Sequence, residues 1–241
     1  MISTEIALPP IVEEWVETYQ NASGDETSER SAVFELVLFF IRCCGLTSDI
    51  QEDEAMDADG ILDVLERLQD QSVKVGDELP FMISSLLPYP ITQTSTAIYP
   101  LTSKAKEFRS FRTNLDTLLS HLIATLSLSP ILYHTTTSTS HSTPLLPLLM
   151  VWLHSMSSSP LRPIRHTSTY IALKINNALC EVAQGVTNDL GTKQRQRDAE
   201  IKKGGTGAAA QKRIREAEKK VEEEHERKVR LEEYMQETMD A

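Results

Sequence analysis

The spacing of apolar residues constrains the fold of this chain more than any other feature. Between residues 108 and 126, and again between residues 166 and 190, apolar side chains recur at steps of three and four, which places them on one face of an α-helix. Only 9 of the 241 residues are glycine, and the period-two alternation typical of half-buried strands is hard to find. The sequence therefore predicts an all-α protein.

Further helices are expected at residues 9–21, which begin with two prolines, and at residues 145–156. Residues 32–44 are apolar on nearly all sides, a pattern that fits a buried helix or a buried strand, and the length of the segment together with the Gly45 that follows favours a helix. Four prolines between residues 79 and 103 predict an extended connector. The whole pattern indicates an irregular α-solenoid of about seven helices. The large apolar residues expected in its core are Phe39, Phe40, Leu115, Leu119, Leu149, Trp152, Ile175 and Val182.

The chain divides by composition into three segments. Residues 1–30 are expected to form an N-terminal helix with an acidic flank, and residues 31–190 a helical domain with a mobile Ser/Thr-rich loop at about 134–143. Residues 191–241 are highly charged and predict a charged extended helix, the first part of a helical hairpin, with a break at the glycines of residues 204–207. The solenoid is therefore expected to end in a long charged helix or a helical hairpin.

The net charge of -11 hides an asymmetry along the chain. Residues 1–100 hold 19 acidic and 4 basic residues, whereas residues 101–241 hold 16 acidic and 20 basic ones. Salt screens electrostatic interactions beyond about 8 to 10 Å, so a locally basic surface can bind phosphates on an acidic protein.

The residue types that carry catalysis or bind metals are not arranged for either. The 6 histidines show no H-E-x-x-H spacing, and the 3 cysteines offer no spaced framework for zinc or disulfides. Neither a G-x-x-x-x-G-K-[ST] loop nor a G-x-S-x-G elbow occurs. Cys43 and Cys44 can be interpreted as reactive thiols or as buried, small hydrophobic side chains, and the second interpretation is favoured. We expect no enzyme activity, cofactor, metal or small-molecule substrate.

No membrane partner is expected either. The longest apolar stretch, residues 145–153, is too short to cross a bilayer core of about 30 Å. The N-terminal residues lack the basic and apolar regions of a signal peptide, which predicts an intracellular protein.

Basic residues form the most informative functional feature. Lys106, Arg109 and Arg112 recur every three residues, with Lys104 just before them, and on one helix they would form a stripe that can follow a phosphate backbone.

A second basic group follows residue 190. An alternative for this group is a solubilising helix surface whose cations pair with nearby carboxylates such as Asp198, Glu200, Glu216 and Glu218, and charge alone favours that alternative. The candidate DNA-binding residues of the second group are Lys193, Arg195, Arg197, Lys202 and Lys203.

Four ordered blocks of sequence are similar to a known family. They are FFIRCCG at residues 39–45, YPLT at residues 99–102, FR-x-N at residues 111–114, and RHTST at residues 165–169, which is followed by a helix and TKQRQRDAE. Together they resemble the STAG domain of the stromal-antigen subunits of cohesin. The residues that carry the structural part of the resemblance are Cys43, Cys44, Gly45, Arg165, His166 and Thr167.

The resemblance implies a non-enzymatic cohesin subunit built from HEAT-like helical repeats, located in the nucleus on chromatin. Its implied roles are sister-chromatid cohesion and chromosome organisation. Its implied partners are double-stranded DNA, bound without sequence preference through a basic surface, and the kleisin chain, other cohesin subunits and regulators. Members of the family are much longer, so this chain is expected to stop inside the hairpin, before the repeats that carry most kleisin contacts.

One departure from the family concerns the basic surface. The family has a basic pair just before the FR of FR-x-N, and here those positions are Arg109 and Ser110, so one charge is missing. The hypothesis is that Lys104 and Lys106 compensate for it. The alternative function is a protein-interaction scaffold whose DNA binding resides in the repeats that this chain lacks.

Overall fold

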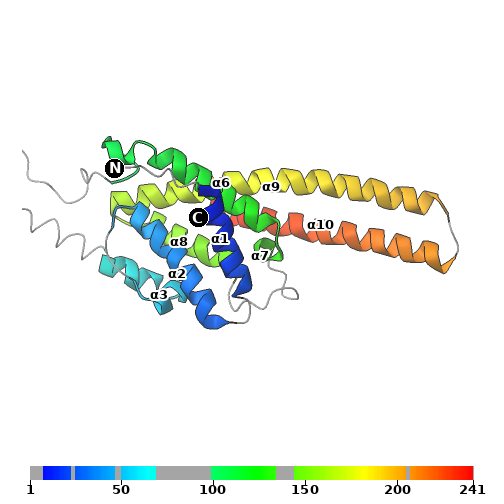
Figure 1. Ribbon diagram of the computed structural model, residues 1–241, viewed down its shortest axis with the longest axis horizontal. Coiled ribbons are helices and arrows are strands. Elements are labelled where there is room, and N and C mark those ends of the chain that lie inside the picture. Colours follow the sequence, from blue (N-terminus) through cyan, green and yellow to red (C-terminus); the bar gives the residue numbers. More distant parts are fainter. Residues whose placement is uncertain are drawn as a thin grey trace, which may run out of the picture. The chain divides into compact units, whose positions relative to one another are not determined.

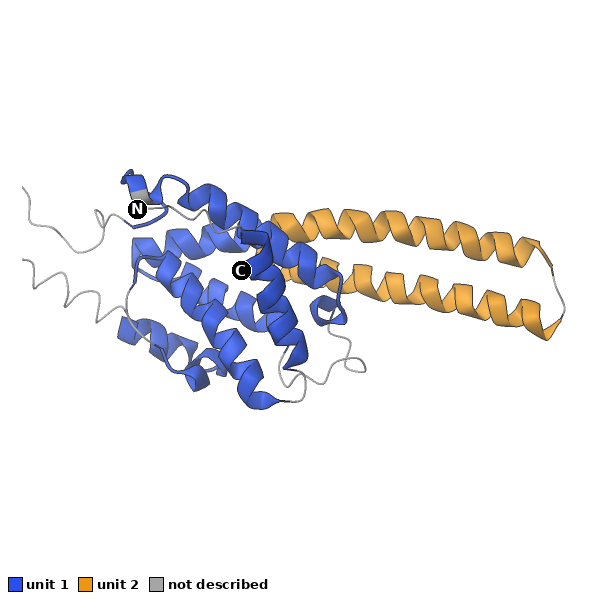
Figure 2. Ribbon diagram, viewed as in Figure 1, with its two compact units in different colours: residues 1–174 blue, residues 175–241 orange. Residues whose placement is uncertain are grey.

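The computed structural model describes residues 8–22, 25–46, 50–68, 99–133, 144–204 and 207–240. In these residues all regular structure is helical, and the all-α prediction is confirmed (Figure 1). The predicted mobile loop at 134–143 lies outside the described residues, as does most of the predicted connector at 79–103. The chain forms two compact units, residues 1–174 and residues 175–241, whereas composition predicted boundaries after residues 30 and 190 (Figure 2).

Unit 1, residues 1–174, is a stack of helices of unequal length. Residues 61–68 are helical as well. The helices with defined bounds are α1 (Leu8–Asn21), α2 (Glu26–Cys43), α3 (Glu52–Met56), the short 3-10 helix η1 (Lys106–Phe108), α6 (Phe111–Ser127), α7 (Pro130–Tyr133), α8 (Leu145–Ser157) and the start of α9 (Arg162–Lys202).

Helix α2 shows how local sequence sets the ends of a helix. Asp25 is the N-cap, and its carboxylate accepts hydrogen bonds from the Thr27 backbone N–H and from the Ser28 hydroxyl. At the other end Gly45 adopts a φ of +84°, the left-handed conformation in which glycine commonly follows a helix. The helical interpretation of residues 32–44 was therefore correct.

The core of unit 1 consists of the apolar faces that the spacing predicted. Trp152 of α8 and Leu119 of α6 are completely buried. The indole Nε1 of Trp152 donates a hydrogen bond of 3.0 Å to the backbone oxygen of Ala55, which ties α8 to α3. The core prediction was wrong for Phe39 and Val182, which are only half-buried.

Residues 165–169 lie inside α9 and join it to neighbouring segments. The Tyr99 hydroxyl lies 2.5 Å from Nδ1 of His166, with the two rings edge to face. The Arg165 guanidinium donates to the backbone oxygen of Ser159 at 2.8 Å, and Thr167 is completely buried. Helix α9 begins at Arg162, so residues 166–169 lie within the helix and not at its N-terminal cap.

Unit 2, residues 175–241, is an antiparallel helical hairpin. The second part of α9 runs out to Lys202, and α10 (Ala208–Asp240) returns beside it (Figure 2). Gly204 has a φ of +56° and lies in the turn between the helices. Of the two endings expected from the sequence, a long charged helix or a helical hairpin, the chain therefore has the hairpin, with Gly204 between its two arms.

The hairpin is apolar at one end and polar at the other. Buried residues in α9 extend to Leu190, and those in α10 begin at Val221. None of the described residues between 191 and 220 is buried. The tip of the hairpin therefore depends on polar contacts and on helix propensity.

Candidate nucleic-acid interface

The first basic group lies where the chain enters α6, and it spans several backbone conformations. Lys106 is in η1, Arg109 follows it, and only Arg112 lies within α6, which begins at Phe111. The prediction that one helix carries all three cations was wrong. The prediction assumed α-helical spacing throughout, whereas Lys106–Phe108 form a 3-10 helix, which has fewer residues per turn.

An aromatic pair lies within this segment. The rings of Phe108 and Phe111 meet edge to face with centroids 6.4 Å apart, and Phe108 remains 37% exposed. The pair brackets the turn that carries Arg109, so it helps to fix the path of the chain there.

Lys104, Lys106, Arg109 and Arg112 are all exposed. Among the described residues no carboxylate lies within 4.0 Å of the charged nitrogens of Lys104, Lys106 or Arg109. Three exposed cations within six positions of the chain therefore have no ion-pair partner among the described side chains.

Arg112 is held in place by α9. Its Nε donates a hydrogen bond of 3.0 Å to the Tyr170 hydroxyl, and its guanidinium carbon lies 5.2 Å from the centroid of the Tyr170 ring. That hydrogen bond is the main cause that raises the pKa of Arg112 above its ordinary value, so the group stays charged.

Tyr170 also connects Asp116 and Lys174. Its hydroxyl donates to Oδ1 of Asp116 at 2.5 Å, and Oδ2 of the same carboxylate lies 3.0 Å from Nζ of Lys174. The ammonium is 5.5 Å from the Tyr170 ring centroid. The hydrogen bond with Asp116 raises the pKa of Lys174. Sequence reasoning missed Asp116, Tyr170 and Lys174, because their proximity depends on which faces of α6 and α9 meet.

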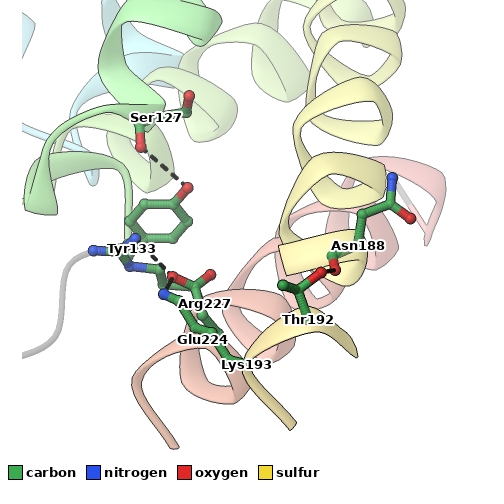
Figure 3. Close-up of polar contacts among 7 residues, drawn as sticks. All are labelled: Ser127, Tyr133, Asn188, Thr192, Lys193, Glu224 and Arg227. Atoms are coloured by element: carbon green, nitrogen blue, oxygen red, sulfur yellow. Dashed lines mark hydrogen bonds and ion pairs between the residues drawn. The ribbon is translucent and has the colours of Figure 1, made fainter. Parts of the chain in front are cut away.

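The second basic group is largely paired within the hairpin. Nζ of Lys193 lies 2.5 Å from Oε1 of Glu224, a buried carboxylate that Arg227 also approaches at 3.2 Å (Figure 3). Two of the remaining cations also have carboxylate partners: Arg197 pairs with Asp198, and Lys203 with Glu200.

Two residues of this group have no carboxylate partner among the described residues. Arg195 donates to the backbone oxygen of Gly191 at 3.1 Å and to the Thr192 hydroxyl at 3.2 Å, while Lys202 is exposed. Thr192 in turn donates to the Asn188 backbone oxygen at 3.0 Å (Figure 3). The carboxylate pairs of Lys193, Arg197 and Lys203 are what the alternative of a solubilised helix surface predicted, whereas Arg195 and Lys202 depart from it.

A shallow groove runs between the two arms of the hairpin near its tip. It has a volume of about 390 Å³ and contains Glu200, which pairs with Arg213 at 3.4 Å. Acidic and basic side chains both face it, so it offers no uniformly positive surface. The lining residues are Lys193, Gln196, Ala199, Glu200, Lys203, Arg213, Glu216, Ala217 and Lys220.

The adjacent cysteines are not exposed nucleophiles. Cys43 and Cys44 are both buried, and burial raises the pKa of the Cys43 thiol to about 12. Burial also raises the pKa of Cys44. The favoured interpretation of small hydrophobic side chains is therefore correct.

Two kinds of feature are absent from the part of the chain that the structure describes. No group of three or more histidine, cysteine, aspartate or glutamate side chains in this part of the chain could hold a metal ion. Nor is any helix in the described ranges both long and apolar enough to cross a membrane.

Comparison with known proteins identifies the family. The STAG domain model matches residues 97–220. The cohesin subunit psc3 of Schizosaccharomyces pombe is 32% identical over 171 residues, which cover 70% of this chain. This chain belongs to the STAG-domain family of cohesin subunits. Three of the four sequence blocks, including YPLT and RHTST, lie inside the matched STAG region, and FFIRCCG lies before it.

Animal members of the family are more distant. Cohesin subunit SA-1 of Xenopus laevis is 25% identical over 199 residues, or 82% of this chain, and subunit SA-3 of Rattus norvegicus is 27% identical over 197 residues, or 80%. The chain spans 15% of the length of psc3 and 13% of SA-1 and SA-3.

A solved cohesin subunit has the same helical fold. The cohesin subunit Scc3 from Z. rouxii superposes with a TM-score of 0.69 over 99% of this chain and 24% of its own, at 15% sequence identity. The prediction of an all-α, HEAT-like solenoid is confirmed. The matched STAG region contains both basic groups and the Arg112–Tyr170–Asp116–Lys174 cluster.

Proposed function

We propose that this chain is a non-enzymatic scaffold region of a cohesin subunit that binds double-stranded DNA through the first basic group. The observation that carries the proposal is the set of exposed cations at Lys104, Lys106 and Arg109 without carboxylate partners among the described residues, next to the fixed guanidinium of Arg112. Lysine and arginine contacts to phosphates release counterions and do not read base edges, so binding is expected to be independent of sequence.

The second basic group has a structural role in this proposal. Lys193, Arg197 and Lys203 are assigned to the hairpin, because their carboxylate partners already neutralise them. Arg195 and Lys202 stay as secondary candidates for phosphate contacts. This division favours unit 1 over unit 2 as the origin of DNA affinity.

Family membership supports a proposal for the cellular role. We assign the protein to sister-chromatid cohesion and chromosome organisation on chromatin in the nucleus. Kleisin, other cohesin subunits and regulators are its proposed partners, mainly through the larger part of the subunit outside these 241 residues.

A second candidate is a protein-interaction scaffold whose DNA affinity lies elsewhere in the subunit. It is favoured by the acidic first hundred residues and by the exposed carboxylates of Glu13, Glu14 and Glu17 on α1. Such a surface repels DNA and attracts basic partner segments.

Fluorescence anisotropy with a labelled duplex separates the two candidates. We expect the wild-type chain to bind weakly at low salt, with a logarithmic salt slope of about -3 to -4 if about four phosphates are neutralised. The triple variant Lys104→Gln/Lys106→Gln/Arg109→Gln should lose most of this affinity and lower the magnitude of the slope by about 3.

A matched control removes the same charge elsewhere. The triple variant Lys212→Gln/Lys219→Gln/Arg230→Gln changes cations of α10 that are exposed or half-buried and pair with carboxylates. It should retain the wild-type slope. Equal losses of affinity in both triple variants would mean that binding depends on net charge and not on the first basic group. No binding by the wild-type chain at low salt would favour the protein-interaction scaffold.

A further inference from the structure

The cluster around Tyr170 brings two cations together on one aromatic ring. Arg112 comes from α6 and Lys174 from α9, and their charged groups lie 5.2 and 5.5 Å from the Tyr170 ring centroid. Like charges in such proximity repel each other, and here the ring and the Asp116 carboxylate offset that repulsion. Among the described residues one carboxylate, Asp116, faces the two cations, so the cluster keeps a net charge of about +1.

The polar atoms of the cluster form a continuous chain. Nε of Arg112 donates to the Tyr170 hydroxyl, that hydroxyl donates to Asp116, and the other carboxylate oxygen accepts from Lys174. Each group has therefore one preferred position, fixed by two helices.

Donors are left over at both cations. Arg112 is exposed, and its terminal Nη1 and Nη2 atoms make no hydrogen bond with a described residue. These two nitrogens form the fork that recognises a phosphate. An ammonium has three N–H donors, so Lys174, with 32% of its side chain exposed, retains donors beyond its bond to Asp116.

We infer that Lys174 is a further phosphate contact of the proposed DNA interface and that Tyr170 is a positioning residue that holds Arg112 and Lys174 for it. The inference rests on the proposed function and extends it by two residues. A guanidinium already seated on a ring and hydrogen-bonded through Nε loses less conformational freedom when it binds a phosphate than a mobile one does. Tyr170 thereby adds affinity without touching DNA.

Tyr170→Phe tests the positioning role because it removes only the hydroxyl. The ring and all charges remain, so a change in net charge cannot explain the result. We expect the dissociation constant for a labelled duplex to rise about two- to tenfold at constant salt, because the hydrogen bond that positions the Arg112 guanidinium is lost. The salt slope should stay the same, because the number of neutralised phosphates is unchanged.

Tyr133→Phe is the matched control. It removes the hydroxyl of a buried tyrosine that donates to the Ser127 backbone oxygen in α6. Its duplex affinity should equal that of the wild-type chain, even where thermal unfolding detects a loss of stability. Unchanged affinity in Tyr170→Phe, or an equal loss in Tyr133→Phe, would contradict the positioning role.

Lys174→Gln tests the contact itself. The magnitude of its salt slope should be lower by about 0.9, which corresponds to one phosphate contact. Lys219→Gln makes the same charge change on α10 and should leave the slope unchanged. Lys174→Arg should retain binding. Identical slopes for Lys174→Gln and Lys219→Gln would overturn the assignment of Lys174.

The outcomes distinguish this inference from the function on which it rests. One outcome is that the Lys104/Lys106/Arg109 triple variant loses binding while Tyr170→Phe and Lys174→Gln bind like the wild-type chain. That outcome would support the proposed DNA interface and exclude only the cluster from it. Absence of salt-sensitive binding by the wild-type chain would remove both.

Discussion

The indole of Trp152 joins two helices that are almost a hundred residues apart in the sequence. Its side chain is completely buried, and its Nε1 donates to the backbone oxygen of Ala55 near the end of α3. The last carbonyl groups of a helix have no partner within that helix, so an external donor satisfies one that would otherwise be buried without a hydrogen bond. One side chain thus supplies both apolar contact and a polar cap.

Trp152→Phe should destabilise the chain by about 2 to 4 kcal/mol, because it leaves a cavity and removes the donor to a buried carbonyl. Urea unfolding followed by circular dichroism at 222 nm measures this free energy. Trp15→Phe is the control, since the Trp15 indole makes a similar bond to Ala32 at 3.2 Å but is only half-buried. Equal losses in the two variants would contradict the role assigned to burial at Trp152.

At the scale of single residues the sequence predicted the environment of a side chain better than its contacts with distant residues. Burial of Cys43 and Cys44 followed from their place on an apolar helix. The contact between Arg112 and Tyr170, 58 residues apart, did not follow, because it depends on the rotation of two helices about their axes. Periodicity assigns a residue to a face and leaves open which other face it meets.

Among the elements, α9 departs most from its predicted length. The apolar stripe fades near residue 190, where the helix was expected to end, yet α9 continues to Lys202. The added turns contain good helix formers such as lysine, arginine and glutamine, and α10 runs beside them. The partner of Lys193 was unpredictable for a related reason: the position of the turn sets which residue of α10 lies opposite it.

Two glycine substitutions should change the stability of the chain in opposite directions. Gly204→Ala forces a Cβ into left-handed backbone at a φ of +56° and should cost about 1 kcal/mol or more. Gly185 lies within α9 with nothing within 4 Å of an added Cβ, so Gly185→Ala should stabilise the chain by about 0.5 to 1 kcal/mol. Thermal unfolding reports both changes, and a stabilising Gly204→Ala would contradict the assigned turn.

Across the whole molecule, stability should vary with the distribution of buried apolar groups. Unit 1 buries large side chains in α2, α6 and α8, and α9 buries side chains as far as Leu190, whereas no described residue from 191 to 220 is buried. The fold class and most helices could be predicted because they follow from this apolar pattern. The two-unit division could not, because α9 is continuous through residue 174.

Amide hydrogen exchange should reproduce this distribution. We expect strong protection in α2, α6, α8 and the first half of α9, and exchange that becomes faster from residue 191 toward the hairpin turn. Added salt should accelerate exchange at the tip, where ion pairs such as Glu200 with Arg213 contribute to stability. Uniform protection along α9, mapped by mass spectrometry of peptic peptides, would contradict this prediction.

The lack of buried side chains in the hairpin tip also has a calorimetric consequence. The heat capacity change of unfolding and the urea m-value both scale with the surface that unfolding exposes, and apolar surface dominates the first. No described residue from 191 to 220 is buried in the folded chain, so unfolding there exposes little additional apolar surface. Melting of the tip should therefore absorb heat as helical hydrogen bonds break, with almost no step in heat capacity, and the global transition should report only the rest of the chain.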